Sequence, residues 1–166
     1  MGLENIIETA ERVGDRDELR RDAFMREFEA YESGELDSFD GTRARLKGQR
    51  EALEELESEL EREESNTEEL VDETDFLTVD QAVRHRDATL EKLREHNEHL
   101  QEFTDAMNQA LDAVERNLDV LERKGSEAVS SDPEPAFERA QEALELHNEA
   151  VEGLNKNMEI LNAYLI

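Results

Sequence analysis

The spacing of apolar residues is the feature of this chain that most constrains its fold. In three long stretches, apolar residues and a few polar ones alternate spacings of three and four. This heptad pattern is typical of helices that pack along a narrow seam, and the period-two alternation of strands is nearly absent. The three seams contain Phe39, Thr42, Leu46, Gln49, Leu53, Leu56 and Leu60; Val79, Val83, Arg86, Leu90, Leu93, Asn97, Leu100, Thr104, Met107, Leu111, Val114, Leu118 and Leu121; and Phe137, Ala140, Leu144, His147, Val151, Leu154, Met158, Leu161 and Leu165.

The seams and the turn signals between them predict about four helices. The first spans about 3–31, with an interruption at Gly14-Asp15 that could divide it into two shorter helices. The second spans about 38–64 and completes an N-terminal region of helices over 1–64. An acidic stretch over 65–77 follows and is expected to be a linker, with Asn66-Thr67 as the break.

The third helix is predicted to be unusually long, spanning about 78–124. Thr78 and Gln81, three residues apart, resemble a capping box at its start. Gly125 is expected to end it, because glycine readily adopts the backbone conformation found after a helix C-terminus.

The fourth helix is predicted over about 133–165, with Asp132 as the capping acid and Pro133 in the first turn. The connection before it is short, so the third and fourth helices should form a long antiparallel hairpin over 78–166. The expected fold is therefore all-α: an antiparallel helical bundle or coiled coil of about four helices with a long third helix.

Two uncharged flanks beside the seam of the fourth helix bear on the size of the bundle. In a chain with 39% charged residues, neither flank carries a charge. Uncharged flanks widen the buried face of a helix, which favours a bundle of three or four helices from one chain, or partly from a second copy. One flank is an amide stripe, Gln141, Asn148, Asn155 and Asn162, and the other is Ala143, Ala150, Asn157 and Tyr164.

The charge balance indicates adaptation to salt. The chain has 46 acidic residues against 19 Lys and Arg, with a formal net charge of −27. Such charge opposes a compact state in dilute buffer, whereas salt near 1 M shortens the screening length to about 3 Å. We expect a cytoplasmic protein of a halophile, with an ordinary acidic coiled coil as the alternative. The acidic N-terminus does not resemble a signal peptide, and no apolar run approaches a membrane span.

Several polar residues in the helices have both a structural and a functional interpretation. His96 and His99 lie one helical turn apart and are weak candidates for metal binding, although a solvated helix surface is the simpler reading. No histidine follows an acid by three residues, so the di-iron bundle motif is absent. Asn97, Arg86 and His147 occupy seam positions, where polar residues set register and partner number. We expect no metal and no cofactor.

One segment reverses the charge pattern. Residues 41–50 contain four cations, Arg43, Arg45, Lys47 and Arg50, and no acid. Arg43, Lys47 and Arg50 share one face of a helix by their spacing. This face could bind nucleic acid or an anionic protein, or it could form ion pairs with acids of a neighbouring helix. Nucleic-acid binding is disfavoured, because phosphate contacts weaken steeply as salt rises.

The sequence predicts a non-enzymatic function. The chain has no Cys, its serines lie mainly near helix ends, and its glycines form no phosphate-binding loop. We expect a scaffold, adaptor or assembly subunit that acts through a protein partner or self-association. A nucleic-acid-associated protein and a metal- or ligand-binding bundle remain alternatives, since an all-α fold does not itself imply a function.

Overall fold

The computed structural model describes residues 17–125 and 128–165, and it places them in an all-α bundle. Its helices are α2 (Asp17–Glu32), α3 (Asp40–Thr74), α4 (Asp80–Lys124) and α5 (Glu134–Leu165). The described residues contain no strand. The predicted all-α helical bundle is therefore confirmed. The part of the expected first helix before residue 17, with its interruption at Gly14-Asp15, lies outside the described residues.

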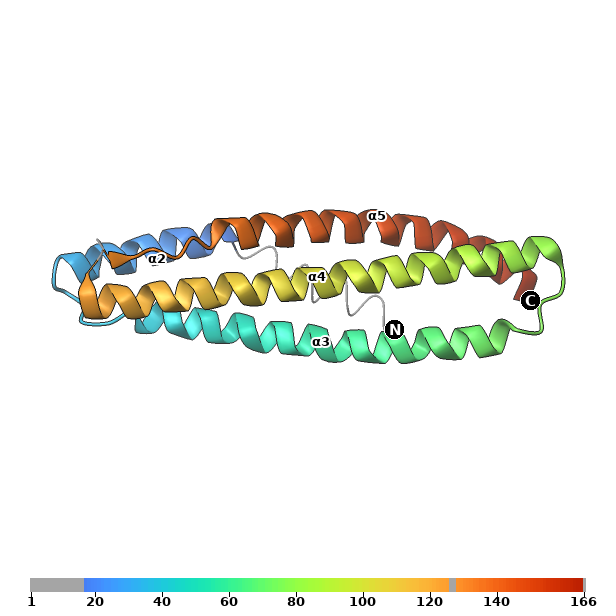
Figure 1. Ribbon diagram of the computed structural model, residues 1–166, viewed down its shortest axis with the longest axis horizontal. Helices are drawn as coiled ribbons and strands as arrows, with labels where there is room; N and C mark the ends of the chain where they lie inside the picture. Colours follow the sequence, from blue (N-terminus) through green and yellow to red (C-terminus); the bar gives the residue numbers. More distant parts are fainter. Residues whose placement is uncertain (1–16, 126–127, 166) are drawn as a thin grey trace.

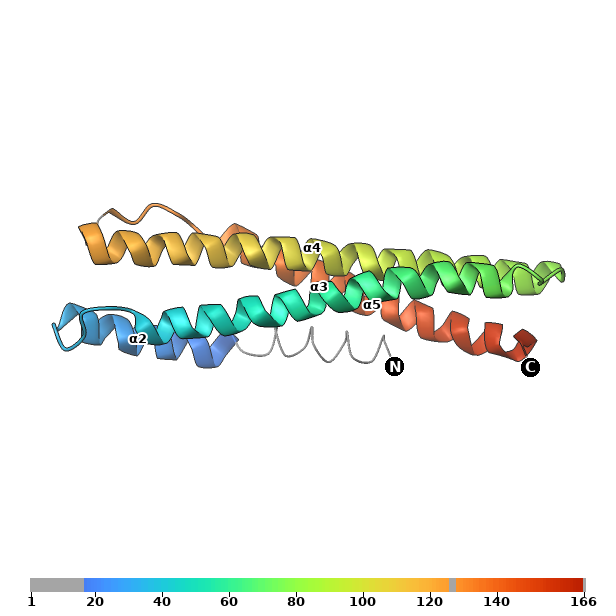
Figure 2. The ribbon, with the colours of Figure 1, turned by 90° about the horizontal axis from the view of Figure 1, so that it is seen from below.

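The four helices form an elongated bundle with α4 at its centre. Figure 1 shows α4 running between α3 and α5 along the length of the molecule. α4 packs against both of them, most extensively against α5, and α2 packs against α3. Figure 2 shows α2 alongside the first part of α3. The helices from both halves of the chain therefore share one bundle.

The acidic stretch expected as a linker over 65–77 is mostly helical, because α3 continues to Thr74. Its seam also continues, through the buried residues Glu63, Thr67 and Thr74. The Thr67 hydroxyl donates to the Glu63 carbonyl at 2.8 Å and the Thr74 hydroxyl to the Leu70 carbonyl at 2.6 Å. Because these hydroxyls are satisfied within the helix, the residues can pack in a seam despite their polarity. The connection between α3 and α4 shrinks to residues 75–79.

Local sequence signals predict two of the helix ends correctly and one incorrectly. Gly125, with φ of +80°, ends α4 and donates its N–H to the Leu121 carbonyl. At the start of α5, an Asp132 carboxylate oxygen accepts the N–H of Glu134 at 3.1 Å. The capping box at Thr78 is not formed: α4 begins at Asp80, after Val79, without a side-chain cap.

The core follows the predicted seams, except at Val79, which is 60% exposed, and it adds a second row on α4. The main buried cluster joins α3, α4 and α5, and its members include Leu56, Leu100 and Ala140. α4 also buries a residue at every seventh position outside its predicted seam, which shows that it is covered on two sides. These residues are Ala82, Thr89, His96, Phe103 and Ala110.

An aromatic cluster joins α2 to the start of α3. Phe39 is fully buried. Its ring lies 6.2 Å from Phe24, 6.5 Å from Phe28 and 4.6 Å from Tyr31 between centroids. Aromatic pairs at such separations stabilise beyond the burial of their area, so this cluster fixes α2 at one end of the bundle.

Candidate functional site

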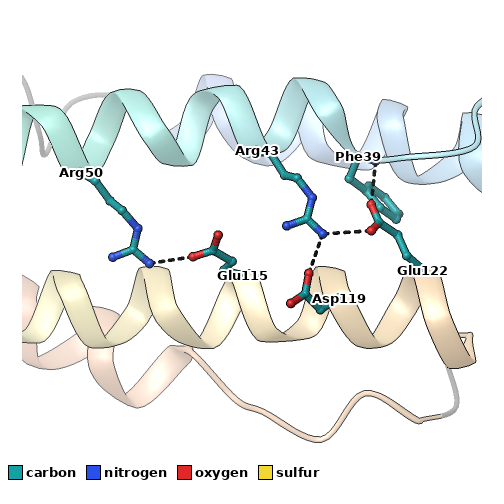
Figure 3. A network of polar contacts seen from close by, with 6 residues as sticks. All are labelled: Phe39, Arg43, Arg50, Glu115, Asp119 and Glu122. Atoms are coloured by element: carbon teal, nitrogen blue, oxygen red, sulfur yellow. Dashed lines mark hydrogen bonds and ion pairs between the residues drawn. The ribbon is translucent and has the colours of Figure 1, made fainter.

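The cations of the basic segment face acids on α4 in a repeating arrangement. One Arg43 guanidinium nitrogen, Nη2, lies 2.7 Å from Asp119 and 3.0 Å from Glu122. Arg50 Nη2 lies 2.6 Å from Asp112 and 3.0 Å from Glu115. The cations are seven residues apart on α3, as are the matching acids on α4. Figure 3 shows this ladder of ion pairs between the two antiparallel helices, apart from Asp112, which is not drawn.

These ion pairs already engage two of the four cations that the sequence suggested for contact with an outside partner. Hydrogen bonds to Asp119 and Asp112 raise the pKa of Arg43 and Arg50, respectively, above the ordinary value. Arg45 binds Glu27 of α2 at 2.8 Å. Lys47 is 78% exposed and lies 3.5 Å from Glu51 on its own helix. The structure thus favours the ion-pair interpretation of the basic segment.

Glu27 is a largely buried acid whose role the sequence analysis missed. Its side chain is 10% exposed. One oxygen accepts the backbone N–H of Gly41 at 2.7 Å, and the other accepts the Thr42 hydroxyl and Arg45. A carboxylate at a helix N-terminus satisfies free N–H groups and complements the helix dipole. Glu27 therefore caps α3 from the neighbouring helix.

Close approach of Glu27 requires the small residue at position 41. A Cβ added to Gly41 would lie 3.0 Å from Glu27 Oε1. On the other side of the same helix end, Glu122 of α4 accepts the N–H of Phe39 at 3.2 Å (Figure 3). Acids from α2 and α4 thus hold the start of α3.

Two histidines meet inside the interface between α4 and α5. His96 is 0% and His147 1% exposed, and their ring centroids lie 4.6 Å apart. None of their four ring nitrogens has a hydrogen-bond partner. Burial lowers the pKa of His96 to about 3 and that of His147 to about 4. Both imidazoles are therefore neutral at pH 7.

The histidine pair differs from the arrangement considered from the sequence. His96 was expected on a solvated surface beside His99, but it is buried because the second row of α4 faces α5. His99 is only partly buried, and its Nδ1 lies 3.5 Å from Glu102. Among the side chains that the structure describes, no three or more His, Asp or Glu gather as a metal site.

The other two polar seam residues are only partly buried. Asn97 has a buried Oδ1 without a hydrogen-bond partner. Arg86 donates to Asp87, its neighbour in sequence, at 2.9 and 3.0 Å. His147 is the most buried of the three predicted register residues.

The two flanks of α5 have different environments, although both were expected to be buried. Ala143 and Ala150 are each 3% exposed, and Asn157 donates to the Ala88 carbonyl of α4 at 3.5 Å. On the opposite flank, the amide residues Gln141, Asn148 and Asn155 are exposed. The prediction of burial was wrong for these three, because α4 covers only one flank of α5. The side chains of Asn162 and Tyr164 lie outside the described part of the chain.

An incompletely covered apolar row lies beside the exposed amides. It consists of Phe137, Leu144, Val151 and Met158, each half-buried and seven residues from the next. We call Gln141, Asn148 and Asn155 the amide row, and the two rows together the α5 face.

The α5 face adjoins a cleft at one end of the bundle. The cleft measures about 890 Å³ and is bordered by residues of α2, α3, α4 and α5. Phe137, Gln141 and Leu144 of the α5 face line it, opposite Phe24 and Met25 of α2. Phe137 and Leu144 thus extend apolar surface from α5 into the cleft, whose lining also includes the charged residues Arg45, Glu134 and Glu138.

No helix among the described residues is both long and apolar enough to cross a membrane. Comparison of the chain with protein-family models, with curated proteins and with solved structures finds no match.

Proposed function

We propose that this chain is a non-enzymatic helical-bundle protein that acts through protein–protein contacts, as a scaffold, adaptor or assembly subunit. The observation that carries the proposal is the α5 face. Its exposed amides and half-buried apolar side chains extend along one helix. Exposed apolar surface rimmed by polar groups is typical of interaction sites.

The charge of the chain makes this uncharged face more significant. With a net charge of −27, most approaches between this protein and another acidic protein are repulsive. The amide and apolar rows contain no charged residue, so their own side chains add no repulsion when a partner approaches. Charge depletion at the core of a contact is also the usual composition of protein interfaces.

The proposed setting is the cytoplasm of a salt-adapted cell. Molar salt screens charges over about 3 Å and leaves apolar contacts effective. A contact made by uncharged residues keeps its strength there, whereas one built on exposed ion pairs does not.

Nucleic-acid association through Arg43, Arg45, Lys47 and Arg50 is the weaker candidate. Three of these cations already bind acids of α2 or α4. A phosphate would have to displace those acids, and molar salt would further weaken the contact.

Affinity capture from a native extract in molar KCl tests the proposal. Wild-type protein should retain a specific partner or a second copy. Asn148→Glu/Asn155→Glu should lose it, because two charges are placed on the amide row. Ser58→Glu/Ser65→Glu is the matched control, since both serines are exposed and seven residues apart on α3. A wild-type protein that remains a strict monomer and retains nothing would refute the proposal.

A further inference from the structure

We infer that the partner of the α5 face is a second copy of this chain, with the two α5 helices antiparallel about a two-fold axis at Asn148. This inference rests on the proposed contact function and names its partner. Three features of α5 support it: the hydrogen-bonding chemistry of the amide row, the symmetry of its spacing, and the residues on either side of the amide row.

The amide row is chemically self-complementary. Each Asn or Gln side chain carries a carbonyl acceptor and two N–H donors, so identical rows can bind one another. Gln141 donates to Glu145 of its own helix at 3.2 Å. A row of charges with one sign would instead repel its copy. A two-fold contact requires the same patch on both copies to be complementary to itself.

The spacing of the amides fits an antiparallel two-fold arrangement. Gln141 and Asn155 each lie seven residues from Asn148, on opposite sides. When the axis passes beside Asn148, this residue meets its own equivalent, and Gln141 meets Asn155 of the second copy. All three positions are then paired in one register.

The apolar row, on one side of the amide row, provides the burial that such a pair needs. In an antiparallel pair about a two-fold axis, the apolar row of one copy faces the apolar row of the other. The half-buried Leu144 therefore approaches Val151 of the second copy, and Phe137 approaches its Met158. These side chains are already half-buried, so completing their burial costs less additional side-chain entropy than ordering fully exposed ones.

Acidic residues on the other side of the amide row make the pairing dependent on salt. Glu145 and Glu152 are exposed, one turn from Asn148 on either side. In the antiparallel pair, Glu145 of each copy lies opposite Glu152 of the other copy, so four carboxylates gather along one edge of the contact. Their repulsion acts in dilute buffer and is screened in molar salt. Association should therefore strengthen as KCl rises.

Single cysteines test the register directly, because the chain contains no native Cys. Asn148→Cys should form a disulfide-linked dimer under mild oxidation in molar KCl. Glu149→Cys, next to it but off the α5 face, is the control and should link at least about tenfold more slowly. Gln141→Cys should not link to itself but should link to Asn155→Cys in a mixture. Self-linking of Gln141→Cys would indicate parallel pairing and overturn the arrangement.

Sedimentation equilibrium of uncross-linked protein provides an independent readout. Wild type should be dimeric in molar KCl, and Asn148→Glu/Asn155→Glu should weaken association at least about tenfold. Ser58→Glu/Ser65→Glu should leave it unchanged. If the protein is a monomer at every salt concentration, the inference that the partner is a second copy is overturned. Capture of a different protein through the same face would then leave the contact function standing, and capture of nothing would remove both.

Discussion

His96 and His147 face each other inside the interface between α4 and α5, with no hydrogen-bond partner on any ring nitrogen. At neutral pH the pair is uncharged and packs like two flat apolar groups. Protonation would place a positive charge in a buried site next to other imidazoles, at a high cost in free energy. The stability of the α4–α5 interface should therefore depend on pH.

The direction of this dependence follows from the two pKa values. In the unfolded chain an imidazole has a pKa near 6.5, whereas burial lowers those of His96 and His147 to about 3 and about 4. Below pH 6.5 the unfolded state takes up protons first, so stability falls from about pH 6.5 to about 4 and levels off near 3. At pH 5 the loss should be roughly 2 kcal/mol per histidine relative to pH 7.5.

Urea unfolding between pH 7.5 and 5 in molar KCl measures this loss. His96→Leu/His147→Leu should remove most of the pH dependence and keep the fold, because two unpartnered polar groups are replaced by apolar ones. His99→Gln, which alters a partly exposed neighbour, should retain it. An unchanged slope in the double leucine variant would contradict the assignment to this pair.

Two glycines of α3 offer a second comparison at the residue scale. Gly48 has open space around its Cβ position, whereas a Cβ on Gly41 would press on Glu27. Gly48→Ala should stabilise the protein by about 0.5–1 kcal/mol through helix propensity. Gly41→Ala should gain less or lose stability, because Glu27 must move from its cap. Thermal unfolding measures the stability of both variants. Equal gains in stability would argue against capping of α3 by Glu27.

At the scale of elements, the contact between α3 and α4 combines an apolar seam with a ladder of ion pairs. Arg43 and Arg50 lie beside the seam, with side chains 31% and 32% exposed. Ion pairs at such exposure contribute under about 1 kcal/mol each. Their main effect is on register, because a shift along α3 would separate both cations from their acids.

Charge reversal in the ladder should reveal this contribution. Arg50→Glu places a third acid beside Asp112 and Glu115, so it should destabilise the protein more in dilute buffer than in molar KCl. Lys47→Glu makes the same change at a largely exposed site on α3 and should cost less at both salt concentrations. Equal effects of the two variants on urea unfolding would mean that the ladder contributes nothing.

For the whole molecule, the balance between self-repulsion and burial should be set by salt. The chain carries a net charge of −27 on an elongated bundle. Screening lowers the repulsion and strengthens burial of the seams.

Helicity measured by circular dichroism should therefore rise with KCl and fall in dilute buffer. Choline chloride at equal ionic strength is the control, because it screens charges with an unrelated cation in place of potassium. A signal that stays constant from low to molar salt would contradict the interpretation of the protein as salt-adapted.

The sequence by itself determined which residues form helices and where several of them end. Heptad spacing acts within one helix, so it correctly placed Leu53, Leu100 and Leu154 in the core. Gly125 and Asp132 act on adjacent backbone, and their roles were equally predictable. The same reasoning failed for residues 65–74, because Thr67 and Thr74 satisfy their hydroxyls inside the helix and a polar seam resembles a linker.

Only the tertiary structure decided which helix lies opposite each face. It paired His96 with His147, directed Glu27 to the start of α3, and left Asn148 exposed while burying Ala150. These outcomes depend on contacts between residues distant in sequence. A pattern along one helix specifies that a face is buried or uncharged, but its partner is set by how the helices pack. The exposed amide row is the clearest example, since its uncharged pattern predicted burial, but α4 covers the opposite flank of α5.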